Sequence, residues 1–192
     1  MTTARNFAKG RVRPIQVIFL HTMQTPETEG RANQVAKWFA GATAPVASAN
    51  VCVDDLLIVR SVDDVDTAWG VIGGNDFGWH LEMSGMANQN KLNWADKYSL
   101  GVLKNASVIS AKTMLLHNLA NHHLTASELV EIKNGNKILT GFAGHDEAVQ
   151  AFKLGDHTDP GFAFPYIYYQ QLVDTELNVL KGINVAPNAT QK

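Results

Sequence analysis

One apolar run near the N-terminus sets the strongest limit on how this chain can fold. The run from Ile15 to Leu20 contains β-branched and aromatic residues and is interrupted only by Gln16. A strand with so little alternation is buried on both faces, and such strands lie in the centre of sheets that helices cover. The sequence therefore predicts an α/β fold with a single mixed central β-sheet flanked by helices.

The rest of the chain supplies further strands and helices. Two apolar segments around Asp54–Asp55 predict a hairpin. Thr125 and Glu128 have the spacing of a capping box, a common start of a helix. The predicted elements are a helix over 30–39, strands over 49–53, 56–62 and 78–83, a long helix over 97–121, a short helix from Thr125 to about 135, and a last helix starting at Pro165. The long helix has a broad apolar face made of Leu100, Leu103, Ala106, Val108, Ile109, Leu115 and Leu116.

The stretch from Gly144 to Gly161 contains residues suited to a metal site. It opens with His145 and closes with Asp159 followed by Pro160–Gly161, a pair that forces a turn and fixes the carboxylate on a bend. Histidine and aspartate are ligands of zinc, and a loop between them can bring both to one point. His21, directly after the first apolar run, offers a third ligand.

The strand predicted over 78–83 provides a second chemical signal. Because side chains alternate along a strand, His80 and Glu82 point to one face, and Leu81 and Met83 point to the other. Two ionisable residues on one face favour a strand that lines a cleft. An edge strand with a solvated polar face explains the same pattern and stays open at this point.

Composition limits the classes of partner. The 192 residues are 45% hydrophobic, which is enough for one domain with a full core. We assign residues 1–183 to this domain and the polar, aperiodic residues 184–192 to a tail or linker. The formal net charge is −2 with no basic stripe, so we expect no nucleic-acid partner. The run from Ile15 to Leu20 is too short for export or for spanning a bilayer, so we expect no membrane partner. We also expect the protein to be a monomer.

Four blocks of sequence together resemble the zinc-dependent N-acetylmuramoyl-L-alanine amidases of the type 2 class, which share a fold with peptidoglycan recognition proteins. The resemblance is greatest to amidase domains of phage endolysins, and its blocks occur in the family's order and at family-like spacing. The blocks are His21–Thr22 with the following helix and Ala47–Ala49; Val53–Asp55 with Ile58–Arg60 and Asp66–Trp69; Asn75 with Gly78–Gly85; and Gly144–His145 with Asp156–Gly161 and Phe164–Pro165.

This resemblance implies roles for individual residues. His21, His145 and Asp159 match the ligands of a catalytic Zn²⁺, with the fourth position left for water. Glu82 matches the glutamate that acts as general base on this water. His157 stands where the family places a lysine or histidine that donates to the oxyanion of the tetrahedral intermediate.

Other positions in the site region bear on substrate binding and depart in part from the family. We assign substrate contact to Asn50, Trp69 and His80. Asn50 and Val51 stand where many members have a histidine–tyrosine pair, and Gly70 stands where a histidine commonly follows the tryptophan. Val51 cannot act as acid or base, so the tyrosine's part in catalysis is absent or falls to another group.

Three functions fit these residues. The first is a zinc amidase that cuts bacterial peptidoglycan between N-acetylmuramic acid and L-alanine. The second is a peptidoglycan-binding module of the same fold without catalysis, and the third is a zinc peptidase acting on the stem or cross-bridge. All of His21, His145, Asp159 and Glu82 are present, which favours the amidase. The lack of an export segment leads us to expect synthesis in the host cytoplasm and access to the wall after the membrane is permeabilised.

Overall fold

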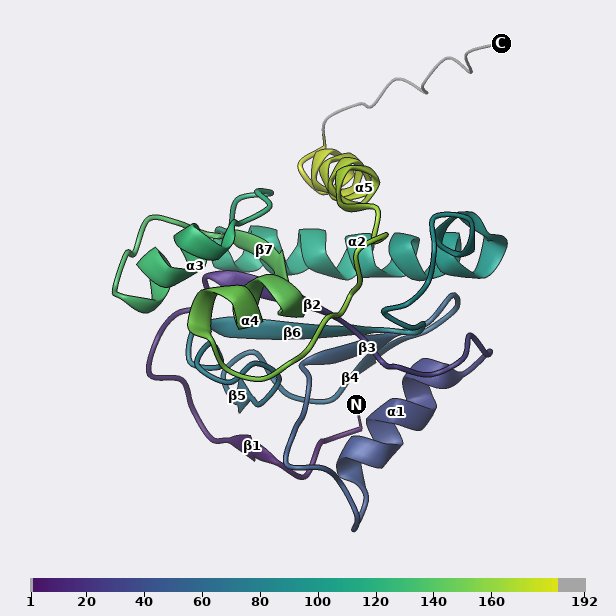
Figure 1. Ribbon diagram of the computed structural model, residues 1–192, viewed down its shortest axis with the longest axis horizontal. Helices are drawn as coiled ribbons and strands as arrows, with labels where there is room; N and C mark the ends of the chain where they lie inside the picture. Colours follow the sequence, from purple (N-terminus) through teal and green to yellow (C-terminus); the bar gives the residue numbers. More distant parts are fainter. Residues whose placement is uncertain (1, 183–192) are drawn as a thin grey trace.

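A five-stranded mixed sheet forms the centre of the computed structural model, which describes residues 2–182 (Figure 1). Its strands are β2 (Val17–Thr22), β3 (Val51–Val53), β4 (Ile58–Arg60), β6 (Gly78–Met83) and β7 (Gly141–Gly144). Their order is β4-β3-β6-β2-β7, in which only β4 runs antiparallel to its neighbour. A separate two-stranded sheet pairs β1 (Phe7–Ala8) with β5 (Thr67–Ala68). The mixed sheet agrees with the fold class that the sequence predicts.

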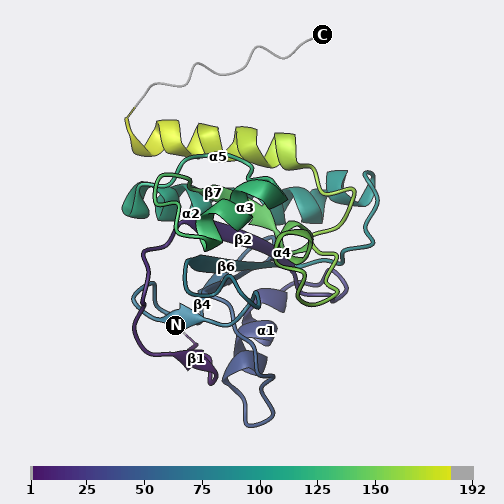
Figure 2. The same ribbon diagram turned by 60° about the vertical axis from the view of Figure 1, so that its left-hand side comes forward.

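Five α-helices and one short 3-10 helix surround the sheet. They are α1 (Arg31–Ala40), η1 (Asn93–Ala95), α2 (Lys97–His117), α3 (Ala126–Lys133), α4 (His145–Phe152) and α5 (Tyr166–Leu180). The long helix α2 lies along one face of the sheet and α5 lies outside it, whereas α1 lies on the opposite face (Figures 1 and 2). None of the helices within residues 2–182 is long and apolar enough to cross a membrane.

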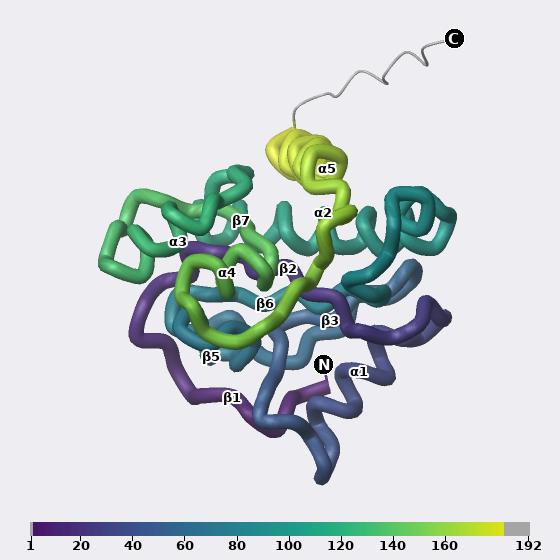
Figure 3. Tube along the Cα trace, viewed as in Figure 1, coloured from purple at the N-terminus to yellow at the C-terminus, as the bar shows by residue number. Residues whose placement is uncertain are grey.

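Two separate apolar clusters occupy the two faces of the central strands. On the side of α2, Leu20 and Leu81 pack with Leu103 of that helix, and all three are fully buried. On the other side, Phe19 packs with Phe152 of α4 in a smaller cluster. Helices α3 and α4 lie together near the β7 edge of the sheet (Figure 3). Strands β2 and β6 are therefore covered on both faces, as their apolar sequences require.

Several predicted elements are confirmed. The hairpin of β3 and β4 turns at Asp54, whose carboxylate accepts hydrogen bonds from the backbone N–H groups of Leu56 and Leu57. The strand over 78–83 is β6. The capping box is present at the start of α3, where Thr125 and Glu128 each bond the other's backbone N–H.

Other predicted boundaries and contacts were wrong. Strand β2 begins at Val17 instead of Ile15, and it ends with His21 and Thr22, as the resemblance implied. Helix α2 ends at His117 because Asn118 adopts a left-handed conformation and its N–H bonds the carbonyl of Met114. The predicted apolar face of α2 is confirmed at Leu103, Ala106 and Ile109, which are buried. It was wrong at Leu100, Leu115 and Leu116, which are exposed. Pro165 precedes the first residue of α5.

No local pattern predicted β1, β5, β7 or α4. The segment after His145, interpreted as a loop, begins with the two turns of α4. The predicted polar tail over 184–192 lies outside the described residues.

Candidate metal centre

Three segments far apart in the sequence bring the predicted ligands together. His21 is the fifth residue of β2, and His145 is the first residue of α4, directly after β7. Because β7 pairs in parallel with β2, with Leu20 opposite Gly144, the two histidines emerge next to each other. Asp159 returns from the turn after α4, and its backbone carbonyl accepts a hydrogen bond from the N–H of Asp146. The predicted ligand set is therefore assembled in one place.

The three side chains form a compact, buried cluster. One ligand atom from each of His21, His145 and Asp159 lies within 4.8 Å of the other two. Nδ1 of His21 is 3.2 Å from Oδ2 of Asp159, and Nδ1 of His145 is 3.5 Å from Oδ1. The exposed fraction of each residue is 6% or less.

The electrostatics of the cluster suit a cation. Burial acts to raise the pKa of Asp159, but the neighbouring imidazoles of His145 and His21 hold it well below its usual range. Burial lowers the pKa of His145 to about 4, against the opposing influence of Asp159. Burial also acts to lower the pKa of His21, yet the bond and charge of Asp159 prevail and raise it. Asp159 is thus a fixed carboxylate and His145 a neutral imidazole.

The donor set fits zinc. Nδ1 of His145 is buried and has no hydrogen-bond partner among residues 2–182, so its lone pair is available. Two imidazole nitrogens and one carboxylate form a three-ligand set, which leaves the fourth position of tetrahedral zinc open for chemistry. His21, His145 and Asp159 are the residues that would hold the ion.

Glu82 lies beside this cluster because β6 is the neighbour of β2. The register places Glu82 directly opposite His21 on the same face of the sheet. The side chain is partly exposed, and its Oε2 atom is buried without a hydrogen-bond partner in the described chain. Burial raises the pKa of Glu82 to about 7, with His21 opposing this shift and Asp159 adding to it. A carboxylate with a pKa near neutrality is suited to take and return a proton.

His157 lies at the rim of the cluster. Its ring stacks on the ring of His145 with centroids 3.9 Å apart, and its Nδ1 is 3.3 Å from Oδ1 of Asp159. The side chain is 58% exposed, unlike those of the three ligands. His157 is therefore accessible to a molecule that approaches the cluster from solvent.

The residues predicted to contact substrate divide into two groups. Trp69 is partly exposed, and its role in substrate binding stays a prediction. Asn50 and His80 have no exposed surface, so the structure gives them supporting positions instead of the predicted substrate contact. The carboxamide of Asn50 accepts a hydrogen bond of 2.9 Å from the backbone N–H of His80. Burial, together with His21 and His145, lowers the pKa of His80 well below its ordinary value, so its ring is neutral.

Glu147 fixes the start of α4, a role that was not predicted from the sequence. Its carboxylate accepts hydrogen bonds from the backbone N–H of Gly144 and from the hydroxyl of Tyr166. It also lies 2.9 Å from Nε2 of His123. A glutamate in the third position of a helix is a known capping signal, and here it fixes the position of His145 at the helix start.

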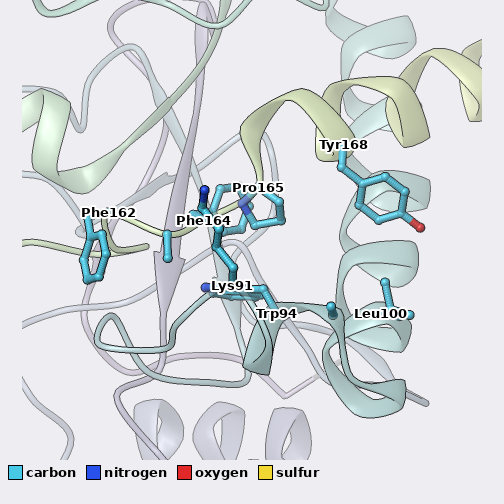
Figure 4. A pocket seen from close by; sticks show the side chains of 9 residues that line it. Lys91, Trp94, Leu100, Phe162, Phe164, Pro165 and Tyr168 are labelled. Carbon is cyan, nitrogen blue, oxygen red and sulfur yellow. The ribbon is translucent and has the colours of Figure 1, made fainter.

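An apolar pocket of about 430 Å³ is lined in part by residues 162–165, which follow the candidate ligand Asp159 closely in the sequence (Figure 4). It was not predicted from the sequence because its walls come from separate segments: η1 with the residues before it, α2, and residues 162–168, which include the first turn of α5. The residues that line it are Lys91, Trp94, Ala95, Leu100, Phe162, Ala163, Phe164, Pro165 and Tyr168.

The fold has neighbours among solved structures. The hydrolase AmiA of Staphylococcus aureus, determined with its ligand, superposes with a TM-score of 0.67 at 14% identity, covering 94% of this chain and 83% of AmiA. A mutant endolysin from Bacillus subtilis gives a TM-score of 0.56 at 12% identity, covering 90% of this chain and 91% of the other. The N-acetylmuramoyl-L-alanine amidase LysC from Clostridium intestinale gives 0.55 at 12% identity, covering 91% and 93%.

No protein-family model matches the sequence, and a search of curated proteins finds no match. At identities of 12–14%, the structural likeness shows the fold. It confirms the predicted α/β architecture over most of the chain.

Proposed function

We propose that this protein is a zinc-dependent N-acetylmuramoyl-L-alanine amidase, which hydrolyses the amide bond between N-acetylmuramic acid and L-alanine in bacterial peptidoglycan. The observation that carries this proposal is the buried set of His21, His145 and Asp159 with Glu82 opposite His21 in the neighbouring strand. The fold shared with a solved N-acetylmuramoyl-L-alanine amidase supports the choice of substrate. The neighbouring endolysin structure supports a role as an endolysin. In this proposal the endolysin is encoded by a phage and reaches the wall once the membrane is permeable.

The chain's own residues divide the work of hydrolysis. When bound, zinc polarises the scissile carbonyl and lowers the pKa of water to about 7, so no protein nucleophile is needed. Glu82 takes a proton from the attacking water and returns it to the leaving amine of L-alanine. His157, exposed at the rim, donates a hydrogen bond to the oxyanion of the tetrahedral intermediate. Trp69 contacts the bound substrate.

Product analysis of digested cell walls tests the bond that is cut. The purified protein should release new L-alanine amino termini from peptidoglycan without new reducing sugar ends. New amino termini at a stem or cross-bridge residue would favour a zinc peptidase instead. Binding to walls without any product would favour a recognition module.

Metal removal tests the cofactor. A chelator should abolish turnover and added zinc should restore it, with zinc content measured by elemental analysis. Asp159→Ala should sharply lower the zinc content, since it removes the one carboxylate ligand. Full zinc occupancy with unchanged lysis in Asp159→Ala would rule out this ligand set.

His157→Ala separates the rim residue from the ligands. It should keep zinc and lower turnover by about 10²–10³-fold, the usual effect of removing one oxyanion donor. A loss of zinc in this variant, with turnover restored at high zinc concentration, would instead place His157 among the ligands.

A further inference from the structure

We propose that His80 is a positioning residue for the metal ligand His21, and that Gly70 is required because it leaves room for the His80 ring. The inference rests on the proposed metal site and extends it to two residues behind the ligands. His80 accepts a hydrogen bond from Nε2 of His21 and so holds Nδ1 of His21 toward Asp159.

The contact between the two imidazoles is buried and directional. Nε2 of His21 lies 3.2 Å from Nδ1 of His80, and both residues are buried. They come from neighbouring strands, where His80 is opposite Phe19. The ring of His80 stacks on the ring of Phe19 with centroids 5.5 Å apart and an interplanar angle of 15°. Its backbone is held by Asn50, so the acceptor nitrogen has a fixed place.

The proton positions follow from the ligand role of His21. A neutral imidazole has one N–H and one lone pair. Nδ1 of His21 faces Asp159 and must offer its lone pair to a metal, so the proton is on Nε2. Among residues 2–182, the hydrogen-bond partner of Nε2 of His21 is Nδ1 of His80. His80 therefore accepts with Nδ1 and has its own proton on Nε2. Metal-bound histidines usually donate to a carboxylate, a carbonyl or water, and here an imidazole takes that place.

Gly70 explains how the His80 ring fits. A Cβ atom at position 70 would lie 2.5 Å from Nδ1 and 2.7 Å from Cγ of His80, and all three of its nearest contacts are atoms of this ring. The nitrogen it would meet is the one that bonds His21. In the amidases that the sequence resembles, a histidine is common at this position. Here, Gly70 and His80 form a matched pair in which the imidazole comes from β6.

Substitutions of His80 test the hydrogen bond apart from packing. His80→Phe keeps an aromatic ring against Phe19 and removes the acceptor, and it should weaken zinc binding by about 10–100-fold. His80→Asn places an amide oxygen near the position of Nδ1 and should recover most of that loss. Zinc affinity is measured by chelator competition, and the fold is checked by circular dichroism of the metal-free protein. Unchanged affinity in His80→Phe, or no recovery in His80→Asn, would overturn the proposal.

A double-mutant cycle tests the pairing with Gly70. Gly70→Ala alone should weaken zinc binding, because its methyl group displaces the His80 ring. In a His80→Ala background, the same substitution should have little effect. Equal losses in both backgrounds would show that Gly70 does not act through His80.

Nitrogen NMR of the zinc-loaded wild-type protein provides a test without any substitution. The expected spectrum has metal on Nδ1 and a proton on Nε2 of His21, and a proton on Nε2 of His80. The opposite assignment for His21 would overturn the proposal. Wild-type protein that binds zinc with this opposite assignment would leave the proposed function intact, whereas wild-type protein that binds no zinc would refute the metal site itself.

Discussion

Both faces of the central strands are largely shielded from solvent, but they differ in chemistry. On the face toward α2, Leu20 and Leu81 are fully buried among apolar side chains. On the opposite face, His21 and His80 are buried to the same degree beside the partly exposed Glu82. Burial of apolar area stabilises a fold by about 25 cal/mol per Å², whereas burial of ionisable groups costs stability unless they are paired. The face toward α2 is therefore apolar, whereas the opposite face combines the apolar cluster around Phe19 with ionisable groups that have shifted pKa values.

Because of this difference, a single step along β6 changes the expected effect of a mutation. Leu81 and Glu82 are neighbours in sequence and point to opposite faces. The apolar face should respond to substitution mainly in stability. The polar face should respond mainly in metal binding and turnover.

Glu82→Gln should have the largest effect on turnover. The amide cannot take a proton from water, so we expect a loss of about 10²–10⁴-fold, the usual contribution of a general base. Zinc content should stay at the wild-type level because Glu82 is not a ligand in the proposed site. Wall digestion and elemental analysis measure the two quantities. A Glu82→Gln protein that has lost its zinc would mean that the roles of Glu82 and Asp159 must be exchanged.

Leu81→Ala should give the contrasting result on the other face. Removal of this fully buried side chain should lower the free energy of unfolding by about 2–5 kcal/mol. Denaturant unfolding of the zinc-free protein measures this loss. Zinc affinity and turnover of the folded fraction should remain near wild type. If zinc is lost while the protein stays folded, the two faces are not independent.

The pH dependence of stability should show the cost of burying Glu82. In the zinc-free fold, burial raises the pKa of Glu82 from 4.5 to about 7, so the folded protein keeps a proton that the unfolded chain has already lost. The free energy of unfolding should therefore fall as pH rises between these two values. The contribution of Glu82 is the difference between the pH profiles of wild type and Glu82→Gln. Identical slopes in the two proteins would show that Glu82 ionises normally in the fold.

Thr125→Ala should have the smallest effect and serves as a reference away from both faces. Thr125 caps α3 through Glu128, and the loss of such a cap costs about 1 kcal/mol. The carboxylate of Glu128 also accepts a hydrogen bond from the backbone N–H of Thr125, which holds the pKa of Glu128 down to about 2. This hydrogen bond therefore stabilises the fold above pH 4.5, and its contribution is lost as pH falls toward 2. Thermal unfolding measures the difference, and turnover should not change. A fall in zinc affinity would show that α3 supports the metal site through α4.

Local sequence was enough to predict much of this molecule. The apolar run before His21, the hairpin at Asp54, the strand over 78–83 and the capping box at Thr125 each depend on interactions within a few residues. The candidate ligands His21, His145 and Asp159 were also predicted from residue types and the resemblance, and the structure brings them together. These features could be predicted because strand alternation, turn chemistry and helix capping are local in the chain.

The surroundings of the ligands depend on contacts between segments that are far apart in the sequence. Strand β7 is four residues long with two glycines, so its sequence has little strand signal, and it forms because β2 offers an edge for pairing. His80 was predicted to contact substrate, but the register of β6 on β2 places it behind His21, 59 residues away in the sequence. Gly70 meets the same ring from a third segment. Such contacts depend on the pairing of distant strands, and the spacing of residues along one segment has no information about that pairing.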